Sequence, residues 1–394
     1  GAFHQLGNSR IRGTGGDLDY DSQKGSAEVM EQEEAYLRTD DLAAGYDGKV
    51  WIREINIHVA RGEIVTLIGP NGAGKSTILK SIAGQLKPVD GAVFLEKTVM
   101  KDWSEQEIAK RMAVMMTERT RPELMTCFDV ASMGRYPHTG RFGTLSDEDK
   151  QVVWEALDMV HAKDLADRDF SRISDGQRQR ILLARAICQQ PQVILLDEPT
   201  AFLDIRHKME LLTILKTLVR ERKVAVLMSM HELDLAQKVS DYVVCVGENQ
   251  IWKCGTPEEI FTETCMEKLF GVPQESYCAE YGSVELPPVK GKPEVFVIGG
   301  NGSGIPVYRR LQRQGIPFAA GILHENDLDY PVAKALAVQV ISERPYEAIQ
   351  QETYEVALGV LKDCRSVICC AKAFGTINRK NEELAQFAQE TGKM

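Results

Sequence analysis

The sequence lacks any apolar run long enough to cross a membrane. A spanning helix needs roughly 18 to 20 uninterrupted apolar residues, and no stretch of the 394 residues approaches that length. If the protein works at a membrane, a partner must supply the spans. The net charge of −10 also argues against indiscriminate binding to nucleic acid, because such binding depends on lysines and arginines that neutralise phosphates.

Paired cysteine motifs are absent as well. The nine cysteines are an odd number, and none lies in a CxxC or Cys/His zinc spacing. We therefore expect buried, reduced thiols. Residues 1–29 have no apolar core segment, which argues against a signal peptide. Glycine and aspartate dominate this stretch, so residues 1–34 are predicted to be a flexible tail, for which a non-native leader ahead of Met30 is one interpretation.

The remaining chain divides into two segments in which strand and helix patterns alternate. Its length predicts two to three domains at about 150 residues each. Residues 35–281 form the first predicted domain, with a mostly helical subdomain at about 102–190. Residues 282–293 hold three prolines without periodicity and are predicted to be a linker. Residues 294–394 predict a small Rossmann-like α/β domain with a parallel sheet.

A phosphate-binding motif lies early in the first domain. Residues 69–77, GPNGAGKST, fit GxxxxGK[ST] and stand between a strand at 64–68 and a helix that begins at Lys75. Glycines at 72 and 74 let backbone N–H groups converge on phosphates at a helix N-terminus. Lys75 would reach the β- and γ-phosphates of ATP, and the Ser76 hydroxyl would coordinate Mg²⁺. The predicted nucleotide-binding residues here are Gly69, Asn71, Gly72, Ala73, Gly74, Lys75, Ser76 and Thr77.

A second motif supplies carboxylates. The apolar run at 193–196 ends in Asp197 and Glu198, and nucleotides bind beyond the carboxyl ends of parallel strands in open α/β sheets. Asp197 is expected to hold Mg²⁺ through water, and Glu198 to polarise the attacking water. Both ATP and Mg²⁺ are therefore predicted cofactors.

The segment ISDGQRQRILLARA resembles the signature motif of ABC-type ATPases, with Ser174, Gly176 and Gln177 at its functional positions. Asp204 is similar to their D-loop aspartate and His231 to their switch histidine. The resemblance spans about residues 36–275. It implies a RecA-like core with a helical subdomain, and ATP held between two copies of the chain.

In that family an aromatic residue upstream of the phosphate loop stacks on adenine, and Tyr46 matches it. Two positions depart from the family pattern. Asp175 replaces the usual first glycine of the signature, where a carboxylate lowers ATP affinity unless it points away or pairs with Arg178. The Q-loop glutamine is missing: Thr117 takes its place and is assigned to Mg²⁺ or the attacking water, with Glu118 as the open alternative.

Residues 134–137, GRYP, resemble the ATPase subunits of importers for iron–siderophore, haem and cobalamin, in which this region contacts the membrane subunit. The resemblance implies a second copy and transmembrane permease subunits as partners, a substrate-binding protein indirectly, no nucleic acid, and a peripheral place on the cytoplasmic face of the cell membrane. The alternative is a soluble ABC ATPase with a regulatory or assembly role and a C-terminal ligand-sensing domain. A charge reversal at Arg135 is expected to uncouple only a transporter.

The predicted C-terminal domain has its own glycine loop, GGNGSG at 299–304, between a strand and a helix. The spacing is not the full GxGxxG, and the acidic residue expected about 20 positions later is ambiguous among Glu325, Asp327 and Asp329. A structural turn and a nucleotide or ligand site both remain open. The segment resembles C-terminal extensions on some cobalamin- or iron-type importer ATPases.

Overall fold

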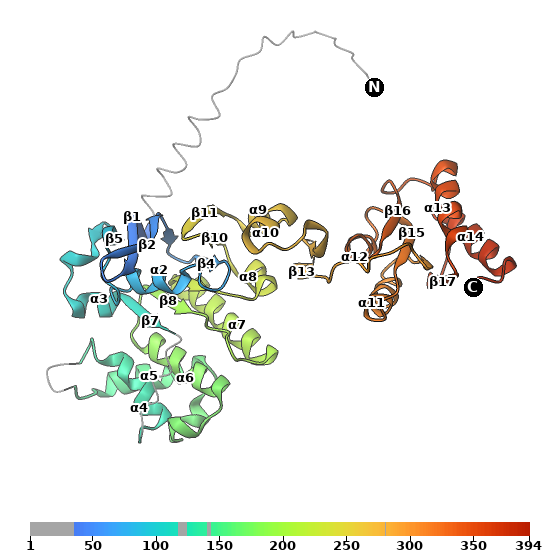
Figure 1. Cartoon of the computed structure of the whole chain (residues 1–394). Coiled ribbons are helices and arrows are strands. Elements are labelled where there is room, and N and C mark those ends of the chain that lie inside the picture. The colour runs from blue at the N-terminus through green and yellow to red at the C-terminus, as the bar shows by residue number, and fades with distance from the viewer. Residues whose placement is uncertain (1–34, 117–123, 140–142, 280) are drawn as a thin grey trace, which may run out of the picture.

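The computed structural model describes residues 35–116, 124–139, 143–279 and 281–394. Within them, Figure 1 shows two α/β units. One is built on an 11-stranded sheet and the other on a four-stranded sheet. This agrees with the α/β class predicted for both parts of the chain. The exact limits 35–281, 282–293 and 294–394 stay a prediction, and the short strand β13 lies inside the predicted linker.

The large sheet joins a parallel core to an antiparallel arm. Its order is β6-β5-β1-β2-β11-β10-β4-β9-β8-β7, with β3 paired to β1. Strands β10, β4, β9, β8 and β7 pair in parallel. The strands are β1 (Ala35–Tyr46), β2 (Lys49–Ile55), β3 (His58–Ala60), β4 (Ile64–Ile68), β5 (Asp90–Leu95), β6 (Thr98–Val99), β7 (Met112–Met115), β8 (Val193–Asp197), β9 (Ala225–Ser229), β10 (Tyr242–Gly247) and β11 (Gln250–Gly255).

Strands β4, β8 and β9 are buried along their whole length, as expected of parallel strands covered on both faces. Successive side chains point to opposite faces, so Ile194 and Leu196 join one core while Val193 and Leu195 join the other. The helices of this unit are α2 (Lys75–Ile82), α3 (Glu105–Arg111), α4 (Cys127–Ser132), α5 (Asp147–Met159), α6 (Asp175–Cys188), α7 (Ile205–Arg222), α8 (Leu233–Val239), α9 (Pro257–Ile260) and α10 (Glu263–Phe270).

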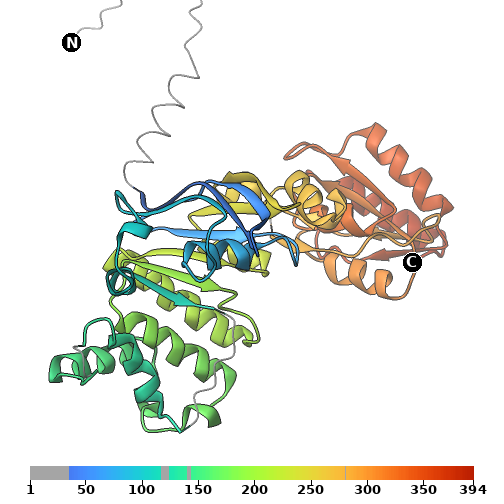
Figure 2. The ribbon, with the colours of Figure 1, turned by 60° about the vertical axis from the view of Figure 1, so that its left-hand side comes forward.

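Several helices within the predicted helical subdomain begin with local start signals. Ser104, Thr126, Ser146 and Ser174 each cap a helix through a reciprocal bond with the third helical residue, a device worth about 1 kcal/mol per helix. Helices α4–α6 lie to one side of the large sheet (Figure 2). The short 3₁₀ turns are η1 (Met100–Asp102), η2 (Met133–Arg135), η3 (Lys163–Leu165), η4 (Phe170–Arg172) and η5 (Gln274–Ser276).

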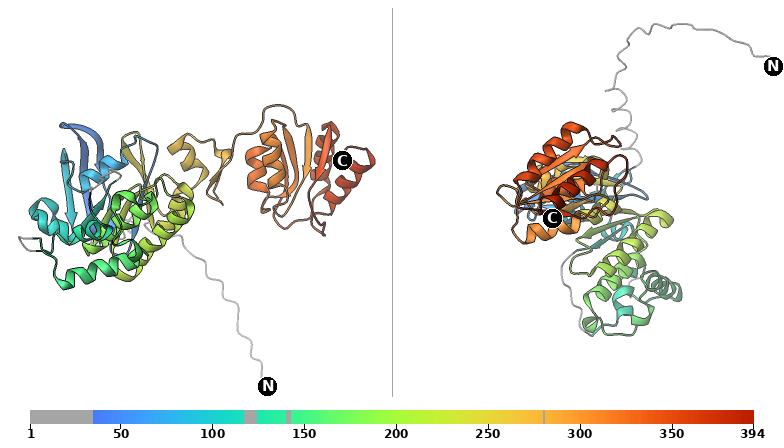
Figure 3. Two further views of the ribbon diagram at one scale, coloured as in Figure 1. Left: turned by 90° about the horizontal axis from the view of Figure 1, so that it is seen from below. Right: turned by 90° about the vertical axis from the view of Figure 1, so that its right-hand side faces the viewer.

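The second unit is a parallel sheet with helices on both faces (Figure 3). Helices α11 and α12 pack on one face, and α13 and α14 on the other. Its elements are β14 (Val295–Ile298), α11 (Ile305–Arg313), β15 (Phe318–His324), α12 (Tyr330–Leu336), β16 (Gln339–Glu343), α13 (Gln351–Asp363), β17 (Ser366–Cys369) and α14 (Arg379–Glu390).

The two units touch through the short hairpin β12 (Tyr277–Cys278) and β13 (Ser283–Val284) and through α12. The Tyr281 hydroxyl donates to the Leu328 carbonyl oxygen at 3.3 Å, and Lys334 pairs with Glu263 at 3.7 Å. Arg309 of α11 also pairs with Glu285. No helix among the described residues is both long and apolar enough to span a bilayer.

Arg135 does not lie on an exposed surface that could contact a permease. The expectation that a charge reversal at Arg135 would uncouple only a transporter is therefore wrong. The side chain is buried at 6% exposure. Its guanidinium donates to Asp149 at 2.8 Å and to the Cys188 carbonyl oxygen at 2.8 Å, which ties η2 to α5 and α6. Burial raises the pKa of Asp149, but hydrogen bonds from Ser146 and Arg135 outweigh it and leave that pKa below its usual value. The neighbouring Tyr136 is the exposed residue of this segment, at 57%.

We predict that Arg135→Ala lowers the free energy of unfolding of the ATPase unit by about 3 kcal/mol, because the buried Asp149 carboxylate loses its partner. Urea denaturation followed by circular dichroism measures the change. Arg172→Ala is the control, since its pair with Asp169 is exposed and worth about 1 kcal/mol or less. Equal losses in the two variants would contradict the structural role of Arg135.

Candidate nucleotide-binding site

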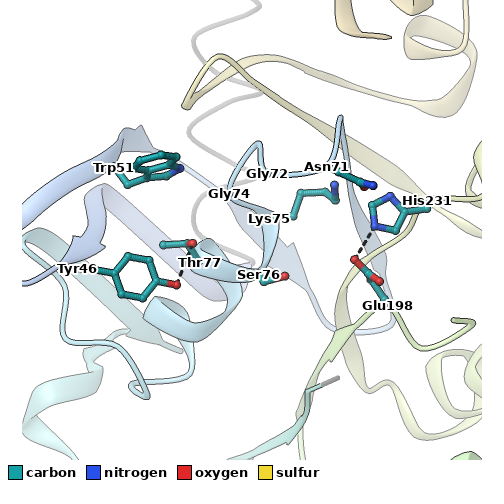
Figure 4. A pocket seen from close by; sticks show the side chains of 10 residues that line it. All are labelled: Tyr46, Trp51, Asn71, Gly72, Gly74, Lys75, Ser76, Thr77, Glu198 and His231. Atoms are coloured by element: carbon teal, nitrogen blue, oxygen red, sulfur yellow. Dashed lines mark hydrogen bonds and ion pairs between the residues drawn. The ribbon is translucent and has the colours of Figure 1, made fainter. Parts of the chain in front are cut away.

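A cavity of about 560 Å³ opens at the loop between β4 and α2. Figure 4 shows the aromatic rings of the arm on one side of it, the loop and the start of α2 in the middle, and the ends of β8 and β9 on the other side. Three parts of the chain that are far apart in sequence therefore meet here. The lining residues are Tyr46, Trp51, Asn71, Gly72, Gly74, Lys75, Ser76, Thr77, Glu198 and His231.

The loop needs glycine for close approach as well as for conformation. Gly74 has φ of 103°, and a Cβ atom there would lie 2.1 Å from Cδ1 of Ile52. Gly69 has φ of 152°, and a Cβ there would lie 2.0 Å from the Val246 carbonyl oxygen. Any other residue at these positions would push the loop away from the arm or from β10.

Lys75 places its ammonium group inside the loop. Its Nζ donates to the carbonyl oxygens of Gly69 at 2.7 Å and Pro70 at 3.0 Å. Burial lowers the pKa of Lys75, and the nearby carboxylates of Glu198 and Asp197 oppose that shift. The Lys75 ammonium is thus held next to the N–H groups of the loop, at the N-terminus of α2. A helix N-terminus favours a bound anion.

The oxygen ligands predicted for Mg²⁺ come together at the end of β8. The Ser76 hydroxyl donates to Asp197 Oδ1 at 3.0 Å. Ser229 donates to the same oxygen at 2.7 Å and accepts from the Glu198 N–H at 3.0 Å. One carboxylate, one hydroxyl and room for phosphate oxygens and water form a donor set that suits Mg²⁺, which rarely takes an all-protein cage. The residues present therefore fit the ion.

Ser229 was not predicted from the sequence. It pairs with Asp197 in the register of β9 and β8, so both side chains project from the same edge of the sheet. The signal available in the sequence was a hydroxyl residue at the end of an apolar run, which by itself also fits an ordinary strand end.

Glu198 and His231 meet at the far wall of the cavity. His231 Nε2 and Glu198 Oε1 lie 2.5 Å apart, and both side chains are partly exposed. Glu198 has φ of 49°, the left-handed region that a residue with a Cβ rarely adopts. Such an outlier at the end of a buried strand is typical of a functional position, and here it turns the carboxylate toward the phosphate loop and His231.

Two aromatic side chains form the wall opposite Glu198. Tyr46 ends β1, is 50% exposed, and has its hydroxyl 3.4 Å from Thr77 Oγ1. Trp51 on β2 is also 50% exposed and was missed by the sequence analysis. Its signal was a large aromatic at a solvent-facing position of a strand, next to the buried Ile52.

The signature residues do not line this cavity. Ser174 caps α6, accepting from the Gln177 N–H at 3.3 Å, while Gln177 Oε1 accepts from the Ser174 N–H at 3.1 Å. Asp175 pairs with Arg178 at 2.5 Å. This pairing is one of the two conditions under which the Asp175 carboxylate is not expected to lower ATP affinity.

The signature instead meets the D-loop. Asp204 caps α7 and accepts from the N–H of His207 at 3.0 Å and lies 2.9 Å from that residue's Nδ1. A Cβ at Gly176 would lie 3.0 Å from the His207 ring, so glycine allows α6 and α7 to approach. Thr117 and Glu118, the two alternatives for the Q-loop, lie outside the described residues.

Comparison with known proteins agrees with this geometry. Residues 52–201 match the ABC transporter family, and residues 318–394 match the MJ0874 family. The chain is 40% identical over 289 residues to an uncharacterized ABC transporter ATP-binding protein of Methanocaldococcus jannaschii, a match covering 73% of this chain and 99% of the relative. The chain belongs to the ATP-binding proteins of ABC transporters.

Two further relatives have names that state a transported solute. The Bacillus subtilis iron(3+)-hydroxamate import ATP-binding protein FhuC is 37% identical over 61% of this chain and 89% of its own length. The Halobacterium salinarum cobalamin import ATP-binding protein BtuD is 32% identical over 76% of this chain and 77% of its own length. Among solved structures, an inward-facing transporter described as metal-chelate type superposes with a TM-score of 0.54 at 28% identity, covering 61% of this chain and 90% of that one.

As a member of this family the chain is an ABC ATPase, which binds and hydrolyses ATP. We predict that Trp51→Ala raises the dissociation constant for ATP about tenfold, because stacking of a base on an aromatic ring contributes roughly 1–3 kcal/mol. Calorimetric titration with ATP measures it. Trp154→Ala is the control, since Trp154 packs on Phe128 in the helical subdomain. Unchanged ATP affinity in Trp51→Ala would show that Trp51 does not stack on the adenine base.

Proposed function

We propose that this chain is the ATP-hydrolysing subunit of an ABC importer for an iron chelate (siderophore), haem or cobalamin. The pairing of Glu198 with His231 at 2.5 Å, beside the phosphate loop, is the observation that carries the hydrolytic role. The named import relatives support the transport role. The chain would act as a peripheral subunit on the cytoplasmic face of the membrane.

Phosphoryl transfer depends on positioning and charge stabilisation more than on covalent chemistry. Lys75 would bind the β- and γ-phosphates, with the loop N–H groups around it. Ser76 and Asp197 would hold Mg²⁺, which supplies charge neutralisation on the phosphates when bound. Glu198 would accept a hydrogen bond from the attacking water and aim it at phosphorus, and His231 would hold the Glu198 carboxylate in place.

A second copy of the chain would complete each site. Ser174, Gly176 and the Asp204 loop lie together but away from the cavity that Lys75 lines. In a head-to-tail dimer these groups would face the ATP of the other copy, where the Ser174 hydroxyl and loop N–H groups contact the γ-phosphate. Closure and reopening of this dimer would then drive the permease subunits, and the substrate-binding protein would take part only through them.

We predict that Glu198→Gln lowers steady-state ATP hydrolysis at least about 100-fold, the lower range for a lost general base, while ATP affinity is retained. Phosphate release and ATP titration measure the two quantities. Glu221→Gln makes the same chemical change on the exposed end of α7 and should hydrolyse ATP at the wild-type rate. Hydrolysis at that rate in Glu198→Gln would refute the assigned role.

We predict that the chain, purified by affinity from detergent-solubilised host membranes, brings a multi-span permease with it in near-equal amounts, as mass spectrometry would show. Tyr136→Asp should lose the permease and keep its ATPase activity, because Tyr136 is the exposed side chain beside the buried Arg135. Tyr346→Asp, an exposed tyrosine of the second unit, is the control. Recovery of soluble proteins alone, with hydrolysis intact, would favour the soluble regulatory ATPase instead.

A further inference from the structure

The four-stranded sheet of the second unit has a point where strand order reverses. The order is β16-β15-β14-β17, so the chain moves outward from β14 through β15 and β16 and then returns to the other side of β14. In open parallel sheets, ligands bind in the crevice outside the carboxyl ends of the two strands at this reversal. A cavity of about 310 Å³ lies there, lined by Gly300, Asn301, Gly302, Ser303 and Asp327 and by Ala371, Lys372, Ala373 and Asn378.

The glycine loop beside this cavity is closed to phosphate by the chain's own carboxylates. The buried Asp329 accepts from the N–H groups of Gly300 at 2.6 Å, Gly304 at 2.9 Å and Ile305 at 3.1 Å. Asp327 accepts from the N–H of Asn301 at 3.0 Å. These are the donors that would hold a pyrophosphate at the start of α11 in a nucleotide-binding unit.

This arrangement decides against the nucleotide interpretation that the sequence left open. A phosphate at the loop would have to displace Asp329, which is fully buried, and would stand beside two carboxylates. The acidic residues that follow β15 therefore have a structural use: they hold the loop shut rather than bind a ribose.

Two opposite charges line the cavity without pairing with each other. Lys372 is exposed and makes no hydrogen bond or ion pair with any described residue. Among the described residues, the Asp327 carboxylate accepts only from the N–H groups of Asn301 and Asp329, and a carboxylate has about four acceptor positions. Asn378 uses its carbonyl oxygen for the Gly375 N–H at 2.6 Å, which leaves its amide N–H groups as donors.

We propose that this crevice binds a small zwitterion, a molecule that carries both a carboxylate and an amino group. The Lys372 ammonium and the Asn378 amide would take the carboxylate, and Asp327 would take the amine. The volume agrees with this choice, because 310 Å³ is at the lower end of the roughly 300–1,000 Å³ of ligand pockets. It suits a molecule of amino-acid size and not a dinucleotide.

The site shares a turn with the contact between the two units. Leu328 stands between Asp327 and Asp329, and its carbonyl oxygen accepts from the Tyr281 hydroxyl of the first unit. The ligand would therefore bind next to the segment that joins the ATPase unit to the second unit.

Titration calorimetry of the full chain tests the proposal. The probes are the twenty common α-amino acids, and for any that binds, its deaminated acid and its carboxamide. We expect binding at one molecule per chain, and affinity at least about tenfold weaker for both analogues, because each lacks one charged contact.

Variants then locate the site. Lys372→Gln should weaken binding about tenfold or more, and it removes no hydrogen bond or ion pair among the described residues. Lys292→Gln is the matched control and should bind like the wild type. Lys292 is an exposed lysine just before β14, at the amino end of the strands and so away from the crevice. No binding by any probe, or equal affinities in the two variants, would overturn the proposal.

A separate titration with ATP or inorganic phosphate addresses the closed loop. One ATP per chain is expected, at the Lys75 site alone. A second equivalent of ATP, or phosphate binding, that disappears in Lys372→Gln would show an anion site in the crevice and would overturn the assignment of a zwitterion.

Discussion

The side-by-side pairing of β4, β9 and β8 is the constraint on which the ATP site depends. These strands are buried along their length, and their parallel register places Leu67, Ser229 and Asp197 in line across the sheet. Because every side chain is packed on one face or the other, a register shift of one residue would move each side chain to the opposite face of the sheet. Ser76 at the start of α2 and Asp197 at the end of β8 are therefore held within hydrogen-bonding distance, although more than 100 residues separate them along the chain.

The same local motif, a strand followed by a glycine loop and a helix, occurs twice and is used in opposite ways. After β4, the loop carbonyl oxygens hold the Lys75 ammonium, and the loop N–H groups are next to a positive charge. After β14, the loop N–H groups are bound by Asp329. Both loops contain glycines, so the glycines do not decide whether a loop can bind an anion. The charge of the side chain that enters the loop does.

The separation of the signature residues from the cavity also follows from packing. The signature serine and the D-loop aspartate are fixed as helix caps, each by bonds to its own helix, and the His207 ring lies against Gly176. Side chains anchored in this way cannot swing across to the cavity of the same chain. A site that uses both sets of residues requires two chains, which is why the dimer enters as part of the proposed function.

The sequence by itself determined the motifs that are defined by local order along the chain. The phosphate loop, the strand ending in Asp197 and Glu198, and the capping serine of the signature are each defined by neighbours within a few positions, and the α/β class follows from alternating strand and helix patterns. The sequence could not show that Arg135 is buried against Asp149, that Trp51 lines the same cavity as Glu198, that Ser229 bonds Asp197, or that Asp329 closes the second glycine loop. Each of these depends on contacts between segments distant in sequence, and only the tertiary packing brings those segments together.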